Sequence, residues 1–101
     1  MSARTAKSSS VERLRASPNF VLAFTLDGRP YVAKETEPYI QYWLTERYRI
    51  LLSMFSGRRG ATAAEAVEGY LRLTFTARRD AERKRLFKAI EDMRAAGVLA
   101  G

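Results

Sequence analysis

The sequence of 101 residues contains no cysteine and no histidine. Without cysteine the chain cannot form disulfide bonds, use a catalytic thiolate or hold a cysteine-based zinc or iron–sulfur site. Without histidine it lacks the commonest general base and metal ligand at neutral pH. A glycine-rich phosphate loop is also missing, because Gly57 and Gly60 flank Arg58 and Arg59 and fit no G-x-x-x-x-G-K pattern. We therefore expect a protein that is not an enzyme and binds no cofactor or metal.

Long apolar runs are missing as well. No segment approaches the roughly 20 apolar residues that span a bilayer, and the N-terminus lacks the hydrophobic stretch of a signal peptide. We therefore expect a cytoplasmic protein that does not bind membranes. Hydrophobic residues make up 47% of the chain, which is ordinary for a globular fold, and the length fits one domain.

The charge is strongly positive. The chain has 18 Lys and Arg against 11 Asp and Glu, which gives a formal net charge of +7. Such an excess favours an acidic partner, which could be nucleic acid, an anionic membrane surface or an acidic peptide. Charge alone does not distinguish these partners. Most acidic residues are isolated and alternate with arginine, the pattern of solvated helix faces rather than of a catalytic pair.

The N-terminal residues differ from the rest. Residues 1–17 are rich in Ser, Lys and Arg and have no apolar period, so they are predicted to form a disordered tail. At most one helical turn is expected at Val11–Leu14, before Ser17-Pro18 interrupts it. The folded domain is predicted to span residues 18–101.

Three short strands are predicted next. Alternating apolar residues over 20–26 indicate a strand, and Asp27-Gly28 is a strong hairpin signal. A shorter return strand covers residues 31–35, and Pro38 separates it from a third strand at Tyr39–Leu44. Because consecutive strands joined by turns pair with each other, we expect an antiparallel meander with the first and third strands at its edges.

Three amphipathic helices follow. Thr45 is expected to cap the first, whose core residues recur at helical spacing up to Phe55 before Gly57 ends it. A capping box formed by Thr62 and Glu65 opens the second, which should end near Phe75. The third is predicted over residues 79–99, with Asp80 as its N-cap and Gly97 in the left-handed conformation after its last turn. The predicted fold class is α+β in the order βββααα.

The last helix carries two stripes. Its core stripe consists of Leu86, Ile90, Met93 and Gly97. A second stripe, about 100° round the helix, combines one aromatic side chain with charged residues and consists of Asp80, Arg83, Lys84, Phe87, Glu91 and Arg94. An aromatic residue among basic ones is not required on a simple surface helix, so this stripe is a candidate binding surface.

The order of elements and several local patterns resemble the PqqD-like domains, also called RiPP recognition elements. The resemblance covers roughly residues 18–99. It rests on the strand-turn-strand before the third strand and on three helical segments: Leu51-Leu52-x-x-Phe55-x-Gly57, Thr62-Ala63-Ala64-Glu65-Ala66-Val67 and Met93-Arg94-Ala95-Ala96-Gly97-Val98-Leu99. It implies a winged-helix-like fold that binds the leader region of a ribosomally synthesised precursor peptide. The implied partner is a peptide-modifying enzyme, such as a radical S-adenosylmethionine maturase or a splicease that excises part of a tyrosine.

The resemblance also implies a binding mode. In the family the leader adds an antiparallel strand to the third strand and lies in the groove between that strand and the third helix. Here Phe87 would be the apolar anchor, and Arg83, Lys84 and Arg94 would meet acidic leader residues. The implied peptide-binding residues are Tyr39, Ile40, Gln41, Tyr42 and Trp43 on the strand, and Arg79, Arg83, Lys84, Phe87, Glu91 and Arg94 on the helix.

Several alternatives stay open at this point, including a purely structural subunit of a larger complex. Phe87 could simply widen the core face, and Tyr39 and Trp43 could cover the core beneath the N-terminal tail. The chain could also be a winged-helix DNA-binding protein, since basic charge, three helices and a hairpin all suit one. Nucleic acid is the less favoured partner for two reasons. The common DNA-binding version has a β-hairpin wing after its recognition helix, whereas only Ala100 and Gly101 follow Leu99 here. In addition, the acidic side chains of Asp80 and Glu91 would face phosphates.

Overall fold

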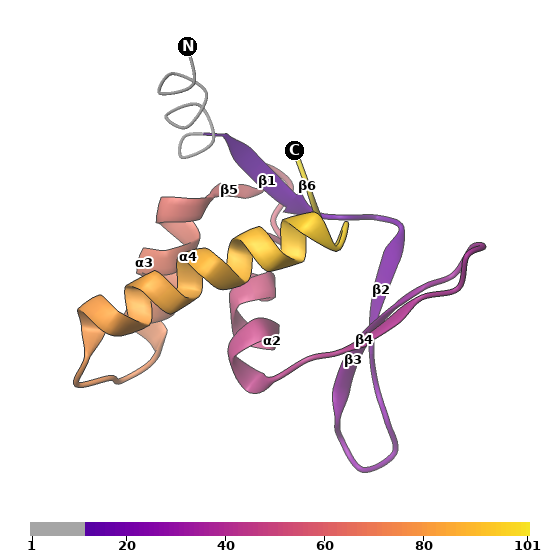
Figure 1. Cartoon of the computed structure of the whole chain (residues 1–101), viewed down its shortest axis with the longest axis horizontal. Coiled ribbons are helices and arrows are strands. Elements are labelled where there is room, and N and C mark those ends of the chain that lie inside the picture. The colour runs from indigo at the N-terminus through magenta and orange to yellow at the C-terminus, as the bar shows by residue number, and fades with distance from the viewer. Residues whose placement is uncertain (1–11) are drawn as a thin grey trace.

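The structure is a computed structural model that describes residues 12–101. It has an α+β fold with two small antiparallel sheets and three helices (Figure 1). In chain order the elements are β1 (Arg13–Ala16), β2 (Phe20–Phe24), β3 (Pro30–Lys34), β4 (Gln41–Trp43), α2 (Glu46–Ser53), β5 (Ala61–Thr62), α3 (Ala63–Leu73), α4 (Arg79–Ala95) and β6 (Leu99–Ala100). None of the helices in this part of the chain is both long and apolar enough to cross a bilayer.

The predicted meander is confirmed. Strands β2, β3 and β4 form one antiparallel sheet in that order, so β2 and β4 are its edges. The hairpin turn lies at Asp27-Gly28, where Gly28 has a φ of 88°, a conformation that glycine adopts without steric cost. Strands β2 and β4 are shorter than expected, and β4 covers only the middle of the predicted Tyr39–Leu44 segment.

The second sheet was not predicted. Its central strand is β1, which pairs with β5 on one side and β6 on the other. The prediction of disorder and of a helical turn is therefore wrong for residues 13–16, and the rest of the tail prediction, residues 1–11, lies outside the described residues. The strand forms because Leu14 is buried in the core (2% exposed) while Arg13 and Arg15 on either side stay in solvent. The backbone of Ser17 extends this anchoring, since its N–H donates to Val98 O at 2.8 Å.

The helix starts follow the predicted caps in two of three cases. Thr45 caps α2 by accepting a hydrogen bond from the Tyr48 N–H, and Thr62 and Glu65 form the expected capping box of α3. The third prediction is wrong, because Arg78 occupies the N-cap position of α4 and Asp80 lies in the first turn. There its carboxylate still lies near the positive end of the helix dipole.

The helix ends are earlier than expected. Helix α2 stops at Ser53, where Met54 bonds back to Leu51, rather than at Gly57, and α3 stops at Leu73. Helix α4 ends at Ala95, and Gly97 follows with the predicted positive φ of 84°. Leu99 lies in strand β6 rather than in the helix. The predicted order βββααα therefore missed three strands, β1, β5 and β6.

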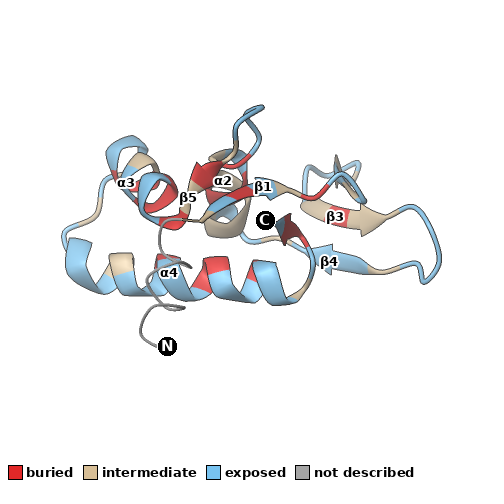
Figure 2. Cartoon of the chain, turned by 90° about the horizontal axis from the view of Figure 1, so that it is seen from above, coloured by how far each residue is buried: buried red, intermediate tan, exposed pale blue. Residues whose placement is uncertain are grey.

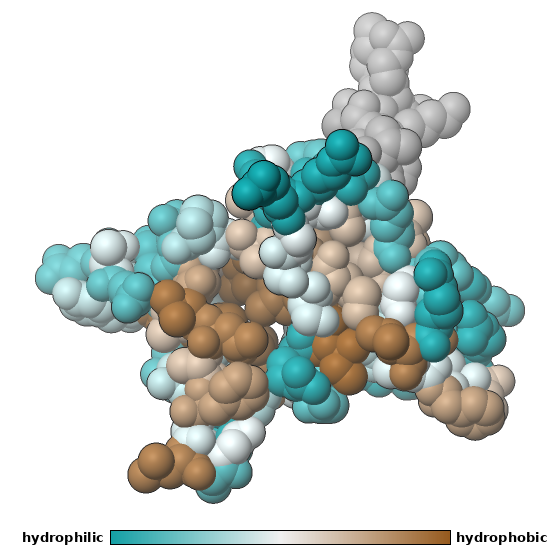
Figure 3. Space-filling view, turned by 180° about the vertical axis from the view of Figure 1, so that it is seen from behind, coloured by the Kyte–Doolittle hydropathy of each residue, from teal (hydrophilic) through white to brown (hydrophobic). Residues whose placement is uncertain are grey.

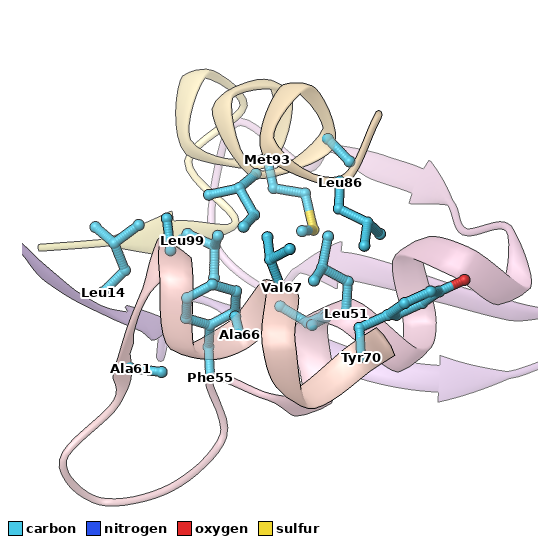
Figure 4. Close-up of a cluster of buried hydrophobic side chains, with 14 of the residues drawn as sticks. Leu14, Leu51, Phe55, Ala61, Ala66, Val67, Tyr70, Leu86, Met93 and Leu99 are labelled. Carbon is cyan, nitrogen blue, oxygen red and sulfur yellow. The ribbon is translucent and has the colours of Figure 1, made fainter. Parts of the chain in front are cut away.

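The core lies among the three helices and the β5-β1-β6 sheet. In Figure 4, Leu86 and Met93 of α4 point towards Val67 of α3 and Leu51 of α2. The meander contributes one residue to the buried hydrophobic set described for residues 12–101, Val32 of β3. Figure 2 shows the consequence, since buried positions cluster on the helices and the second sheet while β4 is exposed along its length.

Candidate functional site

Within residues 12–101, strand β4 has a free backbone edge on the side away from β3. The Lys34 N–H donates to Ile40 O at 2.8 Å, and the Leu44 N–H donates to Pro30 O at 3.1 Å. Hydrogen-bonded pairs alternate along an antiparallel ladder, so Tyr42, which lies opposite Val32, also directs its backbone groups to β3. The N–H and C=O groups of Gln41 and Trp43 therefore point away from β3. This edge can accept another strand.

The side chains of β4 divide between two faces of the sheet. Tyr42 lies on the face of the buried Val32, and its ring is 6.0 Å from that of Phe20. Trp43 lies on the other face and packs edge-on against Tyr31, with 5.6 Å between ring centroids. The guanidinium carbon of Arg29 lies 4.2 Å from the centre of the Trp43 ring, a cation–π contact. Trp43 is held in place by these contacts but stays 52% exposed.

An apolar pocket of about 170 Å³ lies between β4 and α4. Strand β4 supplies one wall, and the last turn of α4, together with the residues that follow it, supplies the other. Ala96, which has a small side chain, and Tyr48 of α2 complete the lining. The lining residues are Tyr42, Trp43, Leu44, Tyr48, Asp92, Met93, Ala96 and Val98. The pocket thus accompanies the free edge of β4 and suits an apolar side chain.

Asp92 organises the polar rim of this pocket. Its carboxylate accepts hydrogen bonds from the Tyr48 hydroxyl at 3.4 Å and from Lys88 Nζ at 3.2 Å. Burial raises the pKa of Tyr48 above its ordinary value, and the negative charge of Asp92 raises it further. The hydrogen bond to Asp92 raises the pKa of Lys88. At neutral pH the rim therefore carries a neutral phenol and an ammonium–carboxylate pair.

An ion pair fixes α2 against the same flank of α4. Arg47 donates to both carboxylate oxygens of Glu82, at 3.1 and 3.3 Å. The hydrogen bond to Glu82 is the main reason why the pKa of Arg47 is raised. Bidentate arginine–carboxylate pairs restrict geometry as well as adding energy, so the pair holds the helix that carries Tyr48 in register with the pocket wall.

The predicted helix stripe lies on the opposite flank of α4. Arg83 pairs with Glu68 of α3 at 3.0 Å, whereas Asp92 contacts Tyr48 of α2. Arg83 and Asp92 are nine residues apart, which at about 100° per residue places them on opposite sides of the helix. Arg94, on the flank of Arg83, pairs with Glu12 at 2.7 Å. The expectation that this stripe lines the groove beside the third strand is therefore wrong, because the groove wall is formed by the other flank.

The remaining predicted helix residues are not brought to β4 either. Arg79 is the first residue of α4, and its guanidinium donates to Leu71 O at 3.4 Å. Lys84 and Glu91 are exposed, and Phe87 is 37% exposed, outside the buried set of α4. A ligand role for these residues stays a prediction. On the strand, Tyr39 is largely exposed and Ile40 half-buried, so the structure places Tyr39, Gln41, Tyr42 and Trp43 at an accessible edge.

Sequence reasoning missed the residues that form the pocket wall. Tyr48, Asp92, Ala96 and Val98 were not predicted to bind the ligand, and Met93 was assigned to the core stripe alone. A signal was present in the connection between elements, since only Leu44 and Thr45 separate β4 from α2. The flank of α4 that contacts α2 must therefore lie beside β4. Which flank that is depends on pairs such as Arg47–Glu82, which helical periodicity does not reveal.

Within residues 12–101 no group of three or more His, Cys, Asp or Glu side chains is placed to hold a metal ion. What the site offers is two outward-facing peptide groups, an apolar pocket and a charged rim. Protein-family models, curated proteins and solved structures gave no significant match to this chain.

Proposed function

We propose that this protein is a non-catalytic module that binds the leader region of a ribosomally synthesised precursor peptide and delivers it to a modifying enzyme. The observation that carries the proposal is the free edge of β4 beside an apolar pocket of about 170 Å³. An extended peptide satisfies the outward-facing groups of Gln41 and Trp43 through its own backbone, whatever its sequence. The pocket then selects a peptide with an apolar side chain at the matching position.

The binding mode is strand addition with a revised helix wall. The ligand would lie antiparallel to β4 and place one side chain between Tyr48 and Ala96, while its alternate side chains face solvent. Lys88 stands one turn from the pocket and pairs with Asp92 at 3.2 Å, so the rim can both donate hydrogen bonds to a polar ligand residue and accept them from it. This mode keeps the predicted strand residues and replaces the stripe around Phe87 by Asp92, Met93 and Ala96.

The resemblance to PqqD-like domains supports the choice of a precursor leader as ligand. In this proposal the winged-helix-like arrangement consists of the β2-β3-β4 meander followed by α2, α3 and α4. The partner enzyme would be a radical S-adenosylmethionine maturase or another peptide-modifying enzyme. A separate binding module raises the concentration of precursor at such an enzyme without taking part in the chemistry.

A binding titration tests the proposal. Fluorescently labelled peptides encoded by short reading frames beside the gene, and a random DNA duplex, would be titrated with the full chain at low and high salt. We expect a peptide to bind with an affinity that largely survives salt, because backbone pairing and apolar burial dominate. Tight DNA binding with a steep salt dependence and no peptide binding would overturn the proposal in favour of a DNA-binding protein.

Two pairs of variants, each a test with its control, locate the peptide. Gln41→Pro removes an outward-facing N–H without touching the ladder to β3, and we expect affinity to fall about tenfold or more, because a hydrogen bond and close strand contact are both lost. Gln41→Ala is the matched control, since it keeps the N–H, and should bind nearly as the parent does. Equal binding by the proline and alanine variants would exclude strand addition at β4.

The second pair tests the pocket. Ala96→Phe should fill the pocket and weaken peptide binding, whereas Phe87→Ala on the opposite flank of α4 should not.

A further inference from the structure

In the described part of the chain, strand β2 is the second free edge of the meander. The Thr25 N–H donates to Arg29 O at 2.9 Å, so the hydrogen-bonded pairs between β2 and β3 fall on Thr25, Ala23 and Val21. The N–H and C=O groups of Leu22 and Phe24 therefore point away from β3. This edge lies on the far side of the meander from β4 and from the peptide site.

The β2 edge is apolar and uncharged. Residues 18–26 contain no charged side chain, and Val21, Leu22, Phe24 and Leu26 are all exposed, Phe24 by 54%. Figure 3, which shows the molecule from behind, has hydrophobic side chains gathered over this part of the surface. Edge strands of monomeric proteins usually carry a lysine, a proline or a bulge that prevents pairing with another chain. Strand β2 has none of these, since its sequence is Phe-Val-Leu-Ala-Phe and its ladder to β3 is unbroken.

The charge of the chain restricts what can pair with this edge. Two copies with a net charge of +7 repel each other across most approaches, but not across a stretch that bears no charge. The same stretch is also self-complementary. If two β2 strands pair antiparallel about a two-fold axis at Ala23, Leu22 of each copy lies opposite Phe24 of the other. Leu26 then lies opposite Phe20, so Phe20, Leu22, Phe24 and Leu26 each meet an apolar neighbour, while Val21 lies opposite Thr25.

We propose that β2 is a homodimer interface, through which two copies of this chain pair edge to edge. The two meanders would then form one six-stranded sheet with a β4 strand at each outer end. Both peptide sites stay open in this dimer, so the inference is independent of the proposed function. The contact involves few side chains and is smaller than a standard interface of about 800 Å² per partner, so a dissociation constant in the micromolar range is expected.

A single cysteine tests the register directly. Because the chain has no cysteine, Ala23→Cys introduces the only thiol. In the proposed pairing residue 23 faces its own copy in a non-hydrogen-bonded pair with a Cα separation of about 4.5 Å, which a disulfide can span. We expect rapid disulfide dimerisation of this variant on mild oxidation. Gln41→Cys is the control at the other edge and should cross-link much more slowly, and equal rates for the two variants would overturn the proposal.

Sedimentation equilibrium tests the interface without cross-linking. From about 5 µM to about 500 µM the parent chain should shift from monomer to dimer, and more strongly at high salt, since salt screens the repulsion between copies. Phe24→Lys should weaken dimerisation at least tenfold, and Leu26→Lys provides a second variant if the first folds poorly by circular dichroism. Leu73→Lys is the matched control, because it changes an exposed leucine of α3, and should leave dimerisation unchanged. A parent chain that stays monomeric over this range would exclude the interface.

Discussion

Two regions of this molecule are built on different interactions. The helical body consists of α2, α3 and α4 with the β5-β1-β6 sheet, and it holds all of the described buried hydrophobic residues except Val32. The meander consists of β2, β3 and β4, and most of its large hydrophobic side chains are exposed. The comparison teaches that stability is concentrated in the helical body, whereas the meander offers apolar surface and two backbone edges to other molecules.

The polar interactions follow the same division. Every ion pair identified within residues 12–101 lies in the helical body or its N-terminal approach, as with Arg47–Glu82 and Arg83–Glu68. The meander is held instead by aromatic contacts, Phe20 with Tyr42 and Tyr31 with Trp43. Matched substitutions in the two regions can therefore separate their energies.

The largest difference is expected for truncation of an apolar side chain. Leu86→Ala in the helical body empties a fully buried position of α4 and should lower the free energy of unfolding by about 3 kcal/mol. Phe24→Ala in the meander removes a half-exposed ring and should cost less than about 1 kcal/mol. Urea unfolding followed by circular dichroism measures both values. Similar losses for the two variants would mean that the meander carries as much of the stability as the body.

The next largest difference concerns two glycines with positive φ. A Cβ at Gly60 would overlap the backbone carbonyl of Leu14, and φ there is 68°, so Gly60→Ala should cost more than about 2 kcal/mol by forcing β1 away from β5. Gly28→Ala meets no atom within 4 Å, so only its φ of 88° is unfavourable and about 1 kcal/mol is expected. Thermal unfolding of both variants gives the comparison. A smaller loss for Gly60→Ala than for Gly28→Ala would contradict the close approach of β1.

Arginine contacts should give a smaller difference. Arg47→Ala breaks the bidentate pair with Glu82, whose side chain is mostly buried, and should cost about 1–2 kcal/mol because a carboxylate loses its partner. Arg29→Ala removes the contact with the Trp43 ring at an exposed site, where about 0.5 kcal/mol is expected. Chemical denaturation at two salt concentrations measures the losses. At both salt concentrations Arg47→Ala should lower the free energy of unfolding more than Arg29→Ala does, and both variants should be less stable than the parent chain.

The smallest difference in stability between the two regions is expected at acid pH. A backbone hydrogen bond from Thr62 lowers the pKa of Glu65 below its ordinary 4.5, and a hydrogen bond from the Thr25 side chain lowers the pKa of Asp27 below 3.8. Both carboxylates therefore add stability that is complete above those ordinary values and is lost as pH falls through the lower pKa of the folded state. Between pH 6 and pH 3, Glu65→Gln and Asp27→Asn should each lose less stability than the parent chain. A pH dependence identical to that of the parent would show that the group does not contribute.

Local signals predicted most of the fold. The Asp27-Gly28 hairpin, the capping box of Thr62 and Glu65, and the turn at Gly97 all depend on neighbouring residues, and the structure confirms each of them. The second sheet could not be predicted in this way. Strands β5 and β6 have two residues each, too few for a period, and β1 forms only because distant segments supply its partners.

The candidate site also has one part that local sequence signals predict and one part that depends on packing between distant segments. The exposed edge strand was predictable, because three consecutive strands joined by turns must leave the third at an edge. The helix wall was not, because α4 carries charged residues on both flanks, and only packing against α2 decides which flank meets β4. The charge pattern favoured Arg83 and Arg94. These two residues pair with Glu68 and Glu12 on the flank of α4 that faces away from β4.

The position of β1 has a consequence for how this protein folds during its synthesis on the ribosome. Arg15 pairs with Ala100, so almost the whole described chain separates the two partners, while β2 and β3 are joined by a tight turn. The hairpin can therefore form soon after it leaves the exit tunnel, long before the strand that precedes it finds a neighbour. During synthesis the apolar β2 edge is exposed before the helical body exists.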